Sequence, residues 1–231
     1  MEFRAVVEQF QVQARSQPQP QRLDTLLALV ERDGSARHAF FAHVIPSRHA
    51  EYPRNLADAI HFLCSLHGRH PGVVDHAAWR TKDGEARNAL EALANWFDTE
   101  RALLTRLVVA VGPLPSTPAQ MQSESIVLAQ RHALEMLAKS ERTGCASGAT
   151  IALALDWSQV RPLVDQIADR LLVAAPANPL PADAVARLGD TIRSDAEDRA
   201  AQFGAQQLLA QHRGLWDLLE SRAVARTANP L

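Results

Sequence analysis

The chain has 231 residues, a formal net charge of −2, 47% hydrophobic residues and 22% charged residues. This length favours one large domain over two small ones, and the composition is ordinary for a globular protein with a sizeable core. Basic residues are dispersed and balanced by acidic ones, which argues against a nucleic-acid partner. The N-terminal residues lack the apolar core of a signal peptide, and the longest apolar run, Ile151 to Leu155, is too short to span a bilayer. We therefore expect a cytoplasmic protein with no nucleic-acid partner and no membrane association.

The composition also predicts helices. Only 5% of the residues are aromatic and alanine is abundant, a balance that suits helices better than sheets. Lysine is nearly absent while arginine and alanine are common, which is typical of the coding bias of GC-rich bacteria. No run of period-two alternation is long enough to predict a strand. The expected fold is an all-α, single-domain bundle of seven to nine helices that comprises residues 1–231.

The first third of the chain predicts short elements. We expect residues 1–20 to be an N-terminal arm with a short amphipathic helix, broken by the prolines of SQPQPQ. Apolar residues at helical spacing predict a helix that ends at Asp33 and Gly34. Ser35 can cap a further short helix, and Pro53 begins the next one, which ends at Gly68.

The rest of the chain predicts long helices at 85–111, 119–155 and 183–211. The central stretch, 119–155, is one helix or two helices joined near Gly144. Asp156 or Ser158 caps a further helix through Val173, Asp183 caps the helix that ends near Gln211, and Gly214 separates it from a final segment. The tail, 226–231, is expected to be frayed.

Seven of the nine histidines are crowded between residues 38 and 76. Imidazole is the commonest metal ligand in proteins, but neither HExxH nor Glu-x-x-His occurs. The nearest matches are Asp58-x-x-His61 and the reversed His132-x-x-Glu135. We therefore expect these histidines to lie at the surface or at helix ends.

Four polar residues lie on or beside apolar faces of the predicted helices: His61, as the candidate from the 61–70 region, with Glu100, His132 and Asp195. If these faces meet in the bundle interior, the four side chains can bind a transition metal or carry protons. The alternative is that they form separate pairs, such as Asp195 with Arg199, which fix the helix register.

Small residues follow one another from Gly144 to Gly148. Such a stripe can form the floor of a cleft beneath a ligand, or it can allow close packing where two helices cross.

Two segments, VVAVGPLPSTPAQ (108–120) and RHALEMLAKSERTGCASGATIALALDW (131–157), resemble an uncharacterised family of all-helical proteins from sphingomonad-type alphaproteobacteria. The resemblance covers about a fifth of the chain. It implies a helical fold and a bacterial source, and it transfers no activity and no catalytic residues.

Two functional hypotheses remain. The protein binds a metal or a small molecule in the bundle interior, or it is a non-catalytic interaction or regulatory module that acts as a homodimer through the small-residue stripe or the C-terminal helix. The sequence leaves open whether it is an enzyme, which ligand it binds and whether a transition metal is its cofactor.

Overall fold

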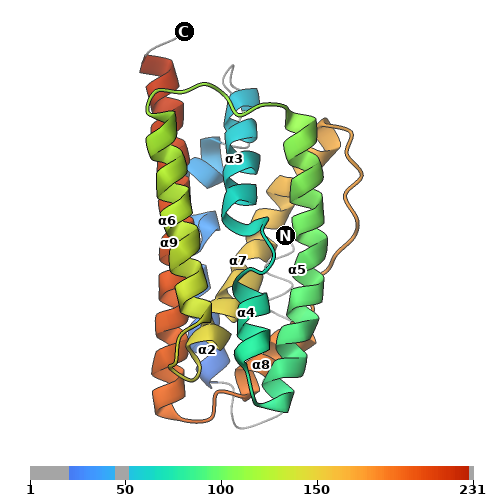
Figure 1. Cartoon of the computed structure of the whole chain (residues 1–231), viewed down its shortest axis with the longest axis vertical. Coiled ribbons are helices and arrows are strands. Elements are labelled where there is room, and N and C mark those ends of the chain that lie inside the picture. The colour runs from blue at the N-terminus through green and yellow to red at the C-terminus, as the bar shows by residue number, and fades with distance from the viewer. Residues whose placement is uncertain (1–20, 45–51, 229–231) are drawn as a thin grey trace.

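The computed structural model describes residues 21–44 and 52–228, and its regular elements in these ranges are all helical. The helices are α2 (Gln21–Asp33), η1 (Ser35–Arg37), η2 (Phe40–Val44), α3 (Tyr52–His67), α4 (Val73–Arg80), α5 (Gly84–Val111), α6 (Gln120–Ala138), α7 (Cys145–Arg170), α8 (Ala182–Asp190) and α9 (Asp195–Ala228). They form one elongated bundle (Figure 1). The described part of the chain contains no strand and eight α-helices, which confirms the predicted all-α class and helix number.

Both predicted ends of the chain fall largely outside the described residues. The N-terminal arm, 1–20, and residues 229–231 are not among them. Residues 226–228, which the sequence assigned to a frayed tail, belong to α9.

The start of α5 is as the sequence predicts. Asp83 accepts hydrogen bonds from the backbone N–H groups of Glu85 and Ala86, at 2.9 and 3.0 Å. These bonds satisfy two of the N–H groups that the first turn leaves without a helical partner. The predicted helix at 85–111 is thereby confirmed to within one residue.

The central stretch is two helices, which is one of the two predicted alternatives. Gly144 has a positive φ of 95° at the junction between α6 and α7. The prediction that Asp156 or Ser158 caps the following helix is wrong, because α7 continues through both residues to Arg170. Asp156 is fully buried and accepts its hydrogen bonds from other elements, so the helix does not need to begin there.

The predicted helix at 183–211 begins within one residue of α8, but it is two helices and its end is wrong. The helix is interrupted between α8 and α9, where Ser194 and Glu197 cap the start of α9 reciprocally. Glu197 Oε2 accepts a hydrogen bond from Ser194 N at 2.9 Å, and Ser194 Oγ accepts one from Glu197 N at 3.2 Å. This is a Ser-x-x-Glu capping box. At the other end α9 continues through Gly214 to Ala228.

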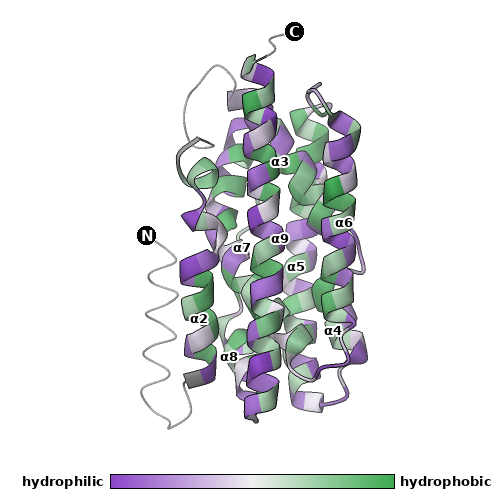
Figure 2. Cartoon of the chain, turned by 90° about the vertical axis from the view of Figure 1, so that its left-hand side faces the viewer, coloured by the Kyte–Doolittle hydropathy of each residue, from purple (hydrophilic) through white to green (hydrophobic). Residues whose placement is uncertain are grey.

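Helix α7 forms the centre of the bundle. Its residues from Gly148 to Trp157 are buried on all sides, and it crosses α9 over an extensive interface. Helices α3 and α4 follow one another along the bundle, so that their junction lies about half-way between its ends (Figure 1). Polar and apolar residues are mixed along α9, as expected for a helix with one face in the core and another in solvent (Figure 2). None of the described helices has both the length and the hydropathy needed to cross a membrane.

Glycine allows the backbones of α7 and α9 to touch. A Cβ atom added to Gly148 would lie 2.0 Å from the carbonyl oxygen of Ala201, and one added to Gly204 would lie 2.1 Å from that of Cys145. The small-residue stripe therefore packs against α9 of the same chain, which is the helix-crossing interpretation of residues 144–148.

A single methyl group at this crossing should destabilise the fold. We expect Gly148→Ala to lower the free energy of unfolding by at least about 2 kcal/mol, because the obstacle is backbone that cannot rotate away. Gly84→Ala is the matched control: no atom lies within 4 Å of the added Cβ, and we expect a change within about 1 kcal/mol. Urea denaturation measures both, and equal midpoints for the two variants would contradict the close approach.

Candidate functional site

The four residues predicted to meet in the bundle interior lie apart. His61 is half-buried, with Nε2 2.8 Å from the carbonyl oxygen of Gly112. His132 is exposed on α6. The side chain of Asp195 is 89% exposed and pairs with Arg22 at 3.2 Å. Two of the four are thus surface residues, because helical phase along a long segment does not fix which face meets the core.

Of the four predicted residues, Glu100 is the one that is fully buried in the bundle interior. It accepts hydrogen bonds from Trp157 Nε1 at 3.0 Å, Arg161 at 2.5 Å and Asn178 Nδ2 at 2.5 Å. Arg161 balances the charge of this carboxylate, and the three donors together connect α5 to α7 and to the segment after α7. In this structure it has a structural role.

Asp58, half of the nearest metal-like motif in the sequence, is also a structural residue. It is buried and accepts hydrogen bonds from Arg222 at 2.9 and 3.1 Å, and from Arg226. The pairing ties α3 to the C-terminal part of α9. Two guanidinium groups on one carboxylate leave no room for a cation.

A different set of titratable residues meets in the core, and we call it the buried triad: Asp156, His212 and His67. Asp156 comes from the middle of α7, His212 from α9 and His67 from the end of α3. His212 Nδ1 lies 2.6 Å from Asp156 Oδ2, and the Nε2 atoms of the two histidines are 2.9 Å apart. All three side chains are at least 95% buried.

Asp156 is further held by the turn after α2. The N–H and O–H groups of Ser35 donate to its two oxygens at 2.7 and 2.6 Å, and Trp216 Nε1 donates to the Ser35 oxygen at 2.8 Å. Both oxygens of Asp156 are thus occupied as hydrogen-bond acceptors. His212 therefore donates from Nδ1, which leaves its Nε2 as an acceptor or, when His212 is protonated, as a second donor.

The contact between the two histidines is a single hydrogen bond, made by one proton. Two Nε2 atoms 2.9 Å apart can share a single N–H···N hydrogen bond, in either direction. With a neutral His212 the donor is His67, and with a protonated His212 the donor is His212.

His67 is held neutral by its surroundings. Its ring packs edge-on against Phe97 and Trp157, with ring centroids 5.9 and 5.8 Å apart. Burial, together with the neighbouring His212 and Arg101, lowers the pKa of His67 well below its usual value. A neutral imidazole in such a place is a base that can accept a proton.

His67 also lines a cavity of about 20 Å³, which we call the interior cavity; its other walls include Arg69, Arg101, Arg131 and Glu135. Arg101 is 95% buried and donates to Asp75 and Asp98. Its Nε is buried and has no hydrogen-bond partner among the described residues. A buried donor without a partner is costly to the fold.

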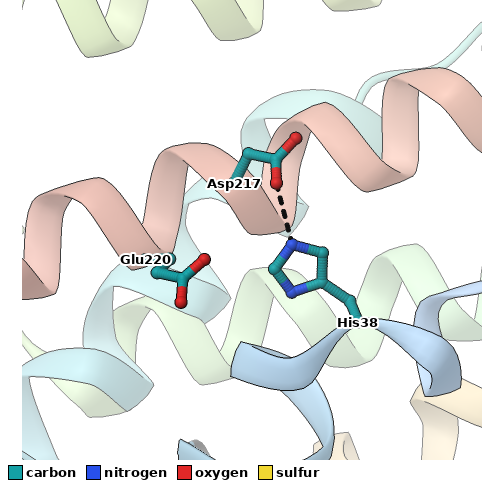
Figure 3. A group of neighbouring side chains, drawn as sticks. All are labelled: His38, Asp217 and Glu220. Atoms are coloured by element: carbon teal, nitrogen blue, oxygen red, sulfur yellow. Dashed lines mark hydrogen bonds and ion pairs between the residues drawn. The ribbon is translucent and has the colours of Figure 1, made fainter.

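Two further groups within the described ranges have metal-ligand atoms within 4.8 Å of one another. In the first, His38 points toward Asp217, with Glu220 one turn along α9 (Figure 3). His38 Nδ1 accepts from the N–H of Phe40 at 3.2 Å, so a neutral ring carries its proton on Nε2 and donates it to Asp217 at 2.9 Å. A metal needs that nitrogen unprotonated, and the observed hydrogen bonds favour a histidine–carboxylate pair.

The second group is His70, Asp75 and Asp98. Arg101 donates to both carboxylates, and Asp75 also accepts from the N–H of Gly72 at 2.7 Å. The guanidinium therefore supplies the positive charge that an ion would bring.

Sequence reasoning missed the buried triad for identifiable reasons. Asp156 was interpreted as a helix cap, and His212 fell just beyond a helix predicted to end at Gln211. His67 was placed at a helix end, which is correct, but it is buried and not exposed. The apolar residues on both sides of Asp156 were the available signal, because a lone carboxylate in such a run needs partners in the core.

The lowered pKa of His67 should make stability depend on pH. Below about pH 6.5 the unfolded chain protonates this histidine and the folded chain does not, so stability falls as the pH decreases. The effect is up to about 1.4 kcal/mol per pH unit, down to the pKa of the folded state. We expect His67→Gln to remove this part of the slope in urea unfolding between pH 7.5 and 5.

The exposed His132 provides the matched control. His132→Gln should keep the wild-type dependence on pH, because its ring stays in solvent. Identical slopes in wild type and His67→Gln would contradict a neutral His67.

Comparison with protein-family models matches residues 30–227 to a family of unknown function, DUF6975. The match includes all three residues of the buried triad and extends far beyond the fifth of the chain that carried the resemblance noted from the sequence. It does not bear on the predicted bacterial source. A search of curated proteins found no match. The chain belongs to the DUF6975 family.

Proposed function

We propose that this protein binds a small anionic molecule at the interior cavity and exchanges a proton with it through His67. The observation that carries the proposal is the 2.9 Å contact between the Nε2 atoms of His67 and His212, with His212 in turn held by Asp156. The proposed site lies in the bundle interior, as one of the two hypotheses from the sequence expected, but on other residues.

The triad is arranged to accept a proton from the cavity. One nitrogen of His67 contacts His212, and its second nitrogen, Nδ1, is then the atom that can take up a proton. Transfer across the Nε2–Nε2 hydrogen bond moves the positive charge to His212, beside the carboxylate of Asp156 at 2.6 Å. His212 keeps its hydrogen bond from Nδ1 to Asp156 whether or not Nε2 carries a proton.

The cavity wall favours an anion. It includes three arginines and one glutamate. A volume of about 20 Å³ holds roughly one water-sized group, so it can admit one acceptor atom of a ligand and not a whole metabolite. Binding an anion would also favour a positive charge on the triad, which couples the anion to the proton.

The test uses formate as the probe and calorimetry at several pH values. We expect formate to bind about tenfold more tightly for each unit by which the pH falls between 7.5 and 5.5, because one proton is taken up with it. Two buffers with different ionisation enthalpies would count that proton directly.

Two variants make the result specific to the triad. His67→Gln should bind formate with no dependence on pH, and His132→Gln should behave as wild type because this ring is exposed on α6. Absence of formate binding, or the same pH dependence in His67→Gln, would overturn the proposal.

A second candidate function is self-association, and an exposed stripe on α6 favours it. Met121, Leu128 and Met136 are spaced seven and eight residues apart and are 81%, 50% and 56% exposed. Hydrophobic residues recur along much of α6 (Figure 2). We propose that a second copy of this chain covers the stripe, since the small-residue stripe first considered for this role is occupied by α9.

Light scattering on a size-exclusion column tests this candidate. Wild type at about 100 μM should elute as a dimer, and Leu128→Glu should be monomeric because a charge in an apolar interface is costly. Val109→Glu, which alters a side chain 79% exposed on α5, is the matched control and should remain dimeric. A monomeric wild type would exclude the homodimer.

A further inference from the structure

A second, larger cavity lies at the end of the bundle where three connections meet. It has a volume of about 360 Å³, and its walls come from the α4–α5 connection, the α6–α7 connection and the α8–α9 connection. These three connections lie at the same end of the bundle, the lower end in Figure 1. We call it the end cavity, and it shares no lining residue with the interior cavity.

The size of the end cavity is that of a small-molecule site. Pockets that bind small ligands usually have volumes of about 300–1,000 Å³. Part of its wall is apolar, from Ala77, Ala86, Ala138 and Ile192, all of which are buried. A ligand would therefore bury an apolar body against this wall.

The charged side chains of the wall favour an anion. Four are cationic and three are anionic: Arg80, Lys82, Arg142 and Arg193 against Asp83, Glu141 and Glu197. The carboxylates are already engaged, because Asp83 caps α5, Glu197 caps α9 and Glu141 pairs with Arg80. Two of the cations are paired as well, Arg80 with Glu141 and Arg193 with Glu85, which leaves Lys82 and Arg142 to attract an anion.

The backbone adds donors beside these cations. Ala146 and Ser147 line the cavity in the first turn of α7, before the first helical hydrogen bond, from Gly148 N to Gly144 O at 2.9 Å. No side chain caps this end of α7. Free N–H groups and the positive end of the helix dipole both favour a negative group at this place.

From the cavity, its charges and these donors together, we propose that the end cavity binds a small organic anion. The phosphate or carboxylate group lies against the first turn of α7, near Lys82 and Arg142, and the apolar part lies on the alanine-rich wall. The inference is independent of the interior site, since the two cavities have separate walls.

A titration followed by amide NMR spectra tests the site with three probes that share an aromatic ring. Phenyl phosphate and benzoate carry the two anionic groups, and benzyl alcohol is neutral. We expect saturable shifts of the Ala146 and Ser147 amides with an anion, and at least about tenfold weaker binding of benzyl alcohol. Raising the salt concentration should weaken the binding of the two anions and leave the affinity for benzyl alcohol unchanged.

Variants that remove one positive charge test whether the cations of the end cavity bind the anion. Lys82→Gln and Arg142→Gln should each lower the affinity for phenyl phosphate about threefold to tenfold. Arg106→Gln removes the same charge from an exposed position roughly 30 Å further along α5, twenty residues beyond Ala86, and should bind as wild type. Three results would each overturn the proposal: no saturable shift with either anion up to about 10 mM, equal binding of benzyl alcohol, or equal affinity in Arg142→Gln and Arg106→Gln.

Discussion

The structure depends on how one buried carboxylate is satisfied. Asp156 is in the middle of the most buried helix, with no exposed surface, and a charge in that place is costly unless every lone pair has a donor. Ser35 and His212 provide those donors. As a result α7, α9 and the turn after α2 are held in one register, and His212 must face inward to meet His67.

Two other buried carboxylates, Glu100 and Asp58, also need donors from neighbouring helices. Glu100 connects α5 to α7, and Asp58 connects α3 to the C-terminal part of α9. Removing one partner from a buried ion pair usually costs about 3–5 kcal/mol, because the remaining charge is left without compensation. Apolar contacts alone would let helices slide by a turn, whereas these pairs fit in one arrangement. The glycines where α7 crosses α9 bring the two backbones close enough for the Asp156–His212 pair to form.

The two cavities differ in size and in the burial of their charged side chains. The interior cavity is small, and its base, His67, is buried and kept neutral by its surroundings. The end cavity is large, and its cations are on exposed side chains at the surface. A buried site of this kind suits the transfer of a proton, where a low dielectric gives each charge a large effect. An open site suits the capture of a whole anion from solution.

The sequence by itself determined the all-α class, the number of helices and the position of α5, because these follow from local periodicity and from the cap at Asp83. It also contains the Ser194-x-x-Glu197 box that separates α8 from α9. Only the tertiary structure decided which polar residues face the core. Exposed His132 and buried His212 both lie inside helices, and which of them is buried depends on packing against α7 and α3. Contacts between residues 56 and 145 positions apart, as in the buried triad, leave no mark on local periodicity.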